Sequence, residues 1–105
     1  MAVNIELEVS SDETVISVAG DVDLYTSPDL RNAILKAVPK AAGRVAVDLS
    51  GVNYIDSSGV ATLVEGLRSA RKHDKGFVLV APSPAVSQVL ELAKLDSVFE
   101  VLPAP

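Results

Sequence analysis

The stretch VDLSGVNYIDSSGVATL, residues 47–63, decides the fold, because it reads as the end of a strand followed by the start of a helix. The strand begins upstream, in RVAVDLS (44–50), a short run in which Val45, Val47 and Leu49 are apolar. Such a run of four to eight residues, rich in β-branched side chains, is typical of a buried strand. The sequence then turns polar at an aspartate and two serines, which predicts a change of element at this point.

Beyond the serines, the apolar residues recur at intervals of three and four. This spacing predicts an amphipathic helix. It ends in the basic run Arg71, Lys72 and His73, which suits a helix C-terminus, and Gly76 stops it. The apolar positions of this helix are Val60, Leu63, Val64, Leu67 and Ala70.

Two strands and a further helix are predicted upstream of this unit. Residues 3–9 alternate between apolar and polar side chains, and residues 14–20 resume the alternation after a polar turn, so the two segments predict a hairpin. Ser27 and Pro28 have the chemistry of a helix start, and Pro39 is expected to close that helix.

Downstream, FVLVA (77–81) is continuously apolar and predicts a strand covered on both faces. Pro82-Ser83-Pro84 opens another helix, and SVFEVL (97–102) predicts a last strand or extended end. Helices that link consecutive strands by short connections favour right-handed crossovers in a parallel sheet. We therefore predict one α/β domain over residues 1–105, with a mixed, mainly parallel sheet of four to five strands and three to four helices.

Composition excludes several classes of function. The formal net charge of −5 argues against binding to nucleic acid or to an anionic membrane surface. With no cysteine, the 105 residues hold no disulfide, thiolate metal site or cysteine nucleophile. No stretch approaches the roughly 18 apolar residues of a membrane span, and the N-terminal sequence resembles neither a signal nor a transit peptide. We expect a cytoplasmic protein without membrane insertion.

The sequence offers no catalytic constellation, so we expect no enzyme activity, no cofactor and no metal. The single histidine, His73, has no nearby ligand partners. It lies at the far end of the predicted helix from Ser57, about 20 Å away at about 1.5 Å per residue, which rules out a Ser-His-Asp triad. Glycine-rich phosphate-binding patterns are absent as well.

Four aspartates lie at or near predicted strand ends: Asp21, Asp23, Asp48 and Asp56. Carboxylates in such places can bind Mg²⁺. They also serve in turns and helix caps, where they accept hydrogen bonds from nearby backbone amides. We favour the second interpretation.

The segment Asp56-Ser57-Ser58-Gly59 supports two compatible interpretations. Serine and aspartate are strong N-cap residues, and a glycine permits a close backbone approach. An exposed serine at a helix start can instead be phosphorylated, with the phosphate near the helix dipole and unpaired N–H groups. One serine can cap the helix while its neighbour is modified, and we expect Ser58 or Asp56 to do part of the capping.

Two motifs make the sequence resemble the STAS-domain family, and most closely its free-standing bacterial anti-sigma factor antagonists. The first is GDVDLYTSPDL (20–30), which precedes the first helix. The second is VDLSGVNYIDSSGVATL (47–63), which contains the Asp-Ser-Ser-Gly helix start. The closing segment LVAPSPAVSQVLELAKLDSVFEV (79–101) is similar to the last strand-helix-strand of the family. The resemblance covers nearly the whole chain.

The resemblance implies a phosphorylation-regulated switch. Unphosphorylated members of this group capture a serine-kinase anti-sigma factor with a GHKL-type ATP site and release the sigma factor. The same kinase ends the capture by phosphorylating the antagonist, and a PP2C-type phosphatase restores it. By resemblance, Ser57 is the phosphoacceptor. The partner-binding residues expected on the same grounds are Asp23, Asp56, Ser57, Ser58, Gly59 and Thr62.

A second role exists within the same family. Other STAS modules are small cytoplasmic subunits of ABC-type lipid transporters, and they often carry a small residue in place of the second serine. Ser58 favours the antagonist group without excluding the transporter role.

Overall fold

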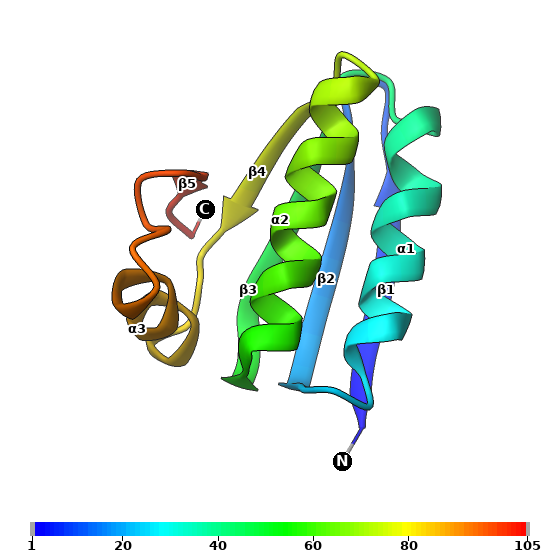
Figure 1. Cartoon of the computed structure of the whole chain (residues 1–105). Coiled ribbons are helices and arrows are strands. Elements are labelled where there is room, and N and C mark those ends of the chain that lie inside the picture. Colours follow the sequence, from blue (N-terminus) through cyan, green and yellow to red (C-terminus); the bar gives the residue numbers. More distant parts are fainter. Residues whose placement is uncertain (1, 105) are drawn as a thin grey trace.

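A computed structural model describes residues 2–104, and within this range five strands and three helices form one α/β domain (Figure 1). The strands and helices alternate after an N-terminal hairpin, which confirms the predicted fold class. In chain order the elements are β1 (Val3–Val9), β2 (Glu13–Val22), α1 (Ser27–Lys40), β3 (Arg44–Ile55), α2 (Ser57–Lys72), β4 (Gly76–Val80), α3 (Pro84–Leu92) and β5 (Glu100–Leu102).

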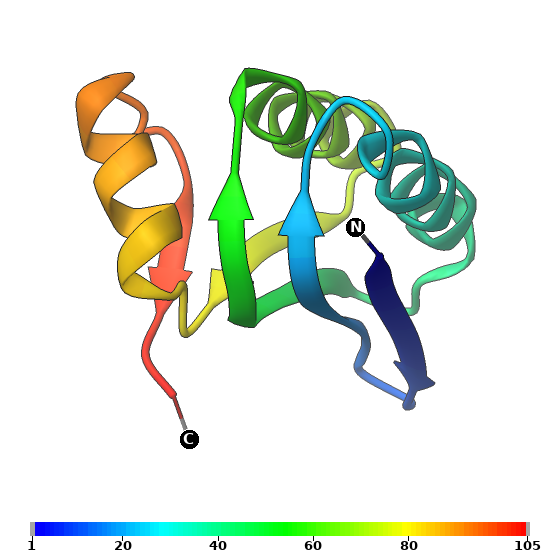
Figure 2. The ribbon, with the colours of Figure 1, turned by 90° about the horizontal axis from the view of Figure 1, so that it is seen from below.

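The strands lie in the sheet in the same order as in the sequence, β1-β2-β3-β4-β5. β1 and β2 form the predicted antiparallel hairpin, and every later pair of neighbours is parallel. A sheet that grows in one direction through crossovers of one hand places all its helices on one face. Accordingly, α1 and α2 lie side by side over one face of the sheet, with α3 beside them towards the β5 edge (Figure 2).

The hydrophobic core fills the space between this sheet face and the three helices. It is almost entirely aliphatic: Ile16, Val47 and Leu49 of the sheet are completely buried. Val86 and Leu90 bring α3 into the same cluster. Burial of such side chains contributes roughly 1.5–3 kcal/mol each relative to exposure, so this single core is the main source of stability.

The opposite sheet face has no helix over it among the described residues. Val15, Ala46 and Val78 lie side by side there in register, and they do not belong to the core cluster. Ala46 and Val78 are nevertheless 2 % exposed, because neighbouring side chains cover them. The prediction of a strand covered on both faces is confirmed for residues 77–79: Phe77 and Leu79 are buried in the core, and Val78 is buried on the opposite face without a helix layer.

Three element boundaries differ from the prediction. β3 continues to Ile55 rather than ending at residue 50, because β2 supplies hydrogen-bonding partners along this extension. Pro39 lies inside the last turn of α1 and does not close it. β5 contains three residues, since only Glu100–Leu102 pair with β4.

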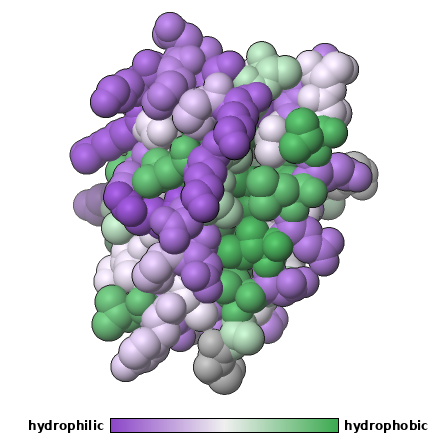
Figure 3. Space-filling view, turned by 90° about the vertical axis from the view of Figure 1, so that its right-hand side faces the viewer, coloured by the Kyte–Doolittle hydropathy of each residue, from purple (hydrophilic) through white to green (hydrophobic). Residues whose placement is uncertain are grey.

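Some apolar side chains remain at the surface beside β1 and α1. Figure 3 shows this face of the molecule, where apolar side chains gather between polar ones. Leu7 and Val9 of β1 are exposed, and they line a shallow groove together with Lys36 and Lys40 of α1. β1 is an edge strand, and the glutamates that alternate with its apolar residues are of the kind that discourages edge-to-edge pairing.

Candidate functional site

The two sequence motifs meet at the carboxyl ends of β2 and β3. These strands are parallel neighbours, so the loop that leaves β2 and the loop that enters α2 lie at the same end of the sheet, at the bottom of Figure 1. The N–H of Asp56 donates a hydrogen bond of 3.1 Å to the carbonyl oxygen of Val22, which joins the two segments directly. Motifs that are about thirty residues apart in the sequence thus form one surface.

Asp56 is the N-cap residue of α2, which confirms part of the capping prediction. Its Oδ1 atom accepts hydrogen bonds from the N–H groups of Ser58 at 2.9 Å and Gly59 at 3.2 Å. The hydroxyl of Ser58 donates to the same oxygen. A carboxylate in this place satisfies amides that have no partner within the helix.

The same contacts keep Asp56 ionised. The hydrogen bond from the Ser58 hydroxyl lowers the pKa of Asp56 most; partial burial opposes this, and the backbone N–H groups of Gly59, Ser58 and Leu24 lower the pKa further. The contact from Leu24 comes from the loop after β2. Asp56 therefore binds both the start of α2 and the neighbouring loop.

The two serines of the motif have different environments. Ser57 is the first residue of α2 and is exposed, and its hydroxyl makes no hydrogen bond to any of residues 2–104. Ser58 is half-buried and its hydroxyl is bound to Asp56. Ser57 is consequently the serine whose oxygen is accessible to an incoming reagent.

Two of the amides that a phosphate could use at this helix start are already occupied. The N–H groups of Ser58 and Gly59 already bind the carboxylate of Asp56. A phosphate on Ser57 would have to displace this carboxylate or lie beside it as a second negative charge. At this helix start, phosphorylation would therefore add repulsion rather than fill an empty anion site.

Asp23 organises the loop between β2 and α1. Its Oδ1 atom accepts hydrogen bonds from the N–H groups of Tyr25 at 2.9 Å and Thr26 at 3.0 Å. The buried hydroxyl of Thr26 accepts from the N–H of Asp23 and donates to the carbonyl of Asp21. Thr26, rather than Ser27, is the N-cap residue of α1, and its hydroxyl serves this loop instead of the helix amides.

The interpretation of the aspartates as turn and cap residues is confirmed for three of the four. Asp23 and Asp56 accept backbone N–H groups as described, and Asp48 accepts the N–H of Ser50 at 2.9 Å. Within residues 2–104, no group of three or more histidine, cysteine, aspartate or glutamate side chains could hold a metal ion.

Gly59 and Thr62 lie beneath this surface. A Cβ atom on Gly59 would approach Cγ1 of Ile55 to 2.6 Å and Cγ1 of Val22 to 2.8 Å, so a glycine is needed for α2 to sit this close to the strand ends. Thr62 is 6 % exposed, and its hydroxyl donates to the carbonyl of Ser58 at 3.0 Å. These two residues can shape the surface but do not present side chains for direct contact.

Three large side chains at this end of the sheet were not identified from the sequence as candidate site residues. Leu24 and Tyr25 lie in the loop between β2 and α1, and Tyr54 lies two residues before Asp56. All three are exposed. A sequence signal was available, because the chain has only two tyrosines and both lie inside the two motifs.

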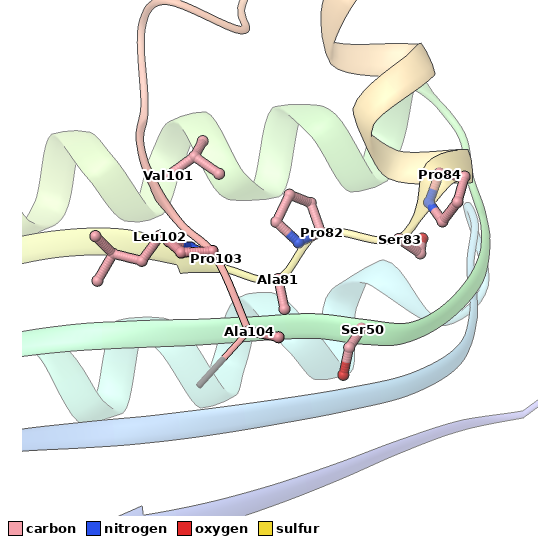
Figure 4. A pocket seen from close by; sticks show the side chains of 9 residues that line it. All are labelled: Ser50, Ala81, Pro82, Ser83, Pro84, Val101, Leu102, Pro103 and Ala104. Carbon is pink, nitrogen blue, oxygen red and sulfur yellow. The ribbon is translucent and has the colours of Figure 1, made fainter.

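A wide surface depression lies elsewhere, between the start of α3 and the C-terminal segment. It has a volume of about 670 Å³, and its lining includes Ser50, Ser83 and Val101 but no acidic, basic or histidine side chain (Figure 4). Ser83 caps α3 by accepting the N–H of Val86 at 3.3 Å. The depression therefore lacks the acid–base groups of an active site.

A match to a known family covers both motifs that form this site. Residues 5–103 match the family model described as "Mlab, STAS domain". The chain belongs to the STAS-domain family. No helix within residues 2–104 of this STAS domain is long and apolar enough to cross a membrane.

Relatives of this STAS domain carry one recurring description. The anti-sigma-B factor antagonist of Listeria monocytogenes is 30% identical over 102 residues, which cover 96% of this chain and 90% of the relative. An anti-sigma factor antagonist from Mycobacterium paratuberculosis has a similar structure, with a TM-score of 0.88, 30% identity, and coverage of 98% of this chain and 87% of that chain. The Bacillus cell fate determinant SpoIIAA, solved in a phosphorylated form, shares the fold with a TM-score of 0.76 and 23% identity, covering 97% and 92% of the two chains.

Proposed function

We propose that this chain is a phosphorylation-regulated anti-sigma factor antagonist of the cytoplasm and that Ser57 is its phosphoacceptor. The observation that carries the proposal is the contrast between the two serines: Ser57 is exposed and free of hydrogen bonds to residues 2–104, whereas Ser58 is bound to Asp56. The antagonist relatives from Listeria and Mycobacterium support the class of function.

In this proposal the chain is a substrate and not a catalyst. A partner kinase binds ATP and transfers the γ-phosphoryl group to Oγ of Ser57, which loses its proton, and ADP leaves. A phosphatase of the PP2C type later returns the hydroxyl by hydrolysis, releasing inorganic phosphate. The unphosphorylated form binds the kinase, a GHKL-type anti-sigma factor, and thereby frees the sigma factor.

Electrostatics supply the switch. Phosphorylation adds about −1.5 to −2 charges at pH 7, next to the ionised Asp56 and on a chain whose net charge is already −5. If Ser57 lies inside the kinase interface, an unpaired dianion buried there costs several kcal/mol. Since each 1.4 kcal/mol or so is tenfold in affinity, the complex dissociates.

The other residues of the site support this surface in different ways. Asp56 and Ser58 hold the start of α2, and Asp23 holds the adjoining loop. Gly59 and Thr62 let α2 pack closely beneath the surface. In the proposal these residues position Ser57 for the kinase rather than take part in the transfer.

The proposal is tested by recovering the partner and then assaying Ser57. The chain is used as bait in an extract of its own cell, and bait and partners are identified by mass spectrometry. The recovered kinase with ATP should add one phosphate to the wild type and to Ser58→Ala, and none to Ser57→Ala. Ser58→Ala is the matched control because Asp56 still caps α2 in that variant.

Two results would contradict the proposal. Phosphorylation of Ser57→Ala at the wild-type rate would refute the assignment of the site. Recovery of a membrane permease and its ATPase in place of a kinase, with an assembly that Ser57→Ala leaves intact, would establish the transporter-subunit role instead.

A further inference from the structure

Three large side chains are exposed at the end of the sheet where β2 and β3 end, in the two segments that meet near Ser57. Tyr25 is 86% exposed, Leu24 67% and Tyr54 52%. Single exposed apolar residues are common on protein surfaces, but these three come from two segments that are bound to each other beside Ser57. Exposed tyrosines on a well-held backbone are typical of the residues that anchor protein interfaces, and an adjacent leucine adds apolar area to them.

The backbone that carries these side chains is held in place before any partner arrives. The N–H of Tyr25 donates to Asp23 at 2.9 Å, and the N–H of Leu24 interacts with the carboxylate of Asp56. Tyr54 lies in β3, opposite Asp21 of β2. A surface fixed in this way loses little backbone entropy on binding, which favours affinity.

The charges around these side chains indicate the chemistry of the partner. Asp29 in the first turn of α1 is exposed and Asp21 is half-buried, and both flank the β2–α1 loop. The nearest basic side chain of α1, Arg31, is already paired with Glu65 of α2. The fitting partner therefore has an apolar pocket with basic side chains at its rim.

We propose that Leu24, Tyr25 and Tyr54 are the apolar anchors through which this chain docks onto the kinase that phosphorylates Ser57. This inference rests on the proposed function, and it assigns binding to residues that flank the phosphoacceptor rather than to the serine itself. A second copy of the chain is a poorer occupant, because two surfaces rimmed by the same aspartates would repel each other.

The test uses the recovered kinase, produced as a pure protein, and the full-length chain. Titration calorimetry compares the wild type with Tyr25→Ala, Leu24→Ser and Tyr54→Thr, and with the double variant of Leu24 and Tyr25. Val9→Thr is the matched control, because Val9 is 72% exposed and pairs with Thr14 at the opposite end of β2 from this site. Thermal unfolding of each variant checks that it is folded.

We expect Tyr25→Ala to weaken kinase binding at least about tenfold and the double variant about a hundredfold, as for residues that anchor interfaces. The control should stay within about twofold. In the phosphorylation assay, KM should rise for the anchor variants while kcat is kept, because Ser57 and its surroundings are unchanged. KM rises without a change in kcat when a variant loses binding that is equally strong in the ground state and in the transition state.

The outcomes separate this inference from the proposed function. If the kinase binds the wild type and phosphorylates Ser57 but binds the anchor variants equally well, the inference is wrong and the proposed function stands. If the wild type binds no kinase, both are wrong. If the wild type is a dimer in sedimentation and Tyr25→Ala is a monomer, these side chains serve a second copy and the inference is overturned.

Discussion

The carboxylate of Asp56 links the start of α2 to the loop after β2. It accepts the N–H groups of Ser58 and Gly59 and the hydroxyl of Ser58. Its lowered pKa means that the folded protein holds the ionised form more firmly than the unfolded chain does. The position of Ser57 therefore depends on the charge of its neighbour.

This dependence gives a prediction for stability against pH. Asp56→Ala should lower the free energy of unfolding by about 1 kcal/mol at pH 7, as for the loss of other N-caps. The pKa is depressed in the folded state, so the stability due to ionisation is present above the ordinary value of 3.8 and is lost as the pH falls through the folded value. Urea unfolding at pH 7 and near pH 3 measures the difference.

Asp56→Asn is the matched control, since asparagine still accepts the hydrogen bonds of the cap but carries no charge. It should cost less than Asp56→Ala at pH 7. For Asp56→Ala, the difference from the wild type should shrink as the pH falls below 3.8. A difference that stays constant from pH 7 to pH 3 would show that the charge of Asp56 contributes nothing.

At the scale of elements, the packing of α2 explains how the site is supported. α2 buries seven of its residues and lies against α1, β3 and β4. Its close approach depends on Gly66, where a Cβ atom would lie 2.8 Å from Cζ of Phe77 and 2.9 Å from Cγ2 of Ile34. Both neighbours are buried, so they have little freedom to move away.

Gly66→Ala should therefore destabilise the protein by about 1–3 kcal/mol, the usual cost of overpacking a core. Intrinsic helix propensity alone would predict the opposite sign, a gain of roughly 0.5–1 kcal/mol for alanine in place of glycine. Equilibrium denaturation measures which effect dominates. Arg68→Ala, at an exposed position of the same helix, should change stability by less than about 0.5 kcal/mol. Stabilisation by Gly66→Ala would show that α2 can shift away from Phe77 without cost.

At the scale of the whole molecule, stability is expected to decrease from the centre of the sheet towards β5. β2 and β3 share a long parallel ladder in the middle, whereas β5 pairs with β4 through three residues. α3 contributes only Val86 and Leu90 as buried residues. Local opening requires less free energy where few buried contacts hold an element.

Hydrogen exchange should reveal this gradient. Under conditions where exchange reports local opening, the amides of α3 and β5 should exchange at least about tenfold faster than those of β2 and β3. Measurement at the level of single amides by NMR is sufficient. Uniform protection across all eight elements would contradict the prediction and would indicate that the molecule opens only as a whole.

Local chemistry explains why most of the fold could be predicted. The hairpin, the two capped helices α2 and α3, and the strand around residues 44–50 follow from alternation, helical spacing and cap residues within each segment. The prediction fails where the structure of a segment depends on a partner that is distant in the sequence. β3 is longer than its apolar run because β2 pairs with it along the extension.

The sequence by itself determined that Asp56, Ser57 and Ser58 start a helix and that a second motif accompanies them. The hydrogen bond from Ser58 to Asp56 is local, and it distinguishes the bound serine from the free one. Only the tertiary structure decided that the loop after β2 meets this helix start, where the N–H of Asp56 binds the carbonyl of Val22 and the N–H of Leu24 lies by the carboxylate of Asp56. The tertiary structure also places Leu24, Tyr25 and Tyr54 at the end of the sheet that carries Ser57. Hydrogen-bond partners and exposure are set by neighbours in space, which periodicity along a chain does not encode.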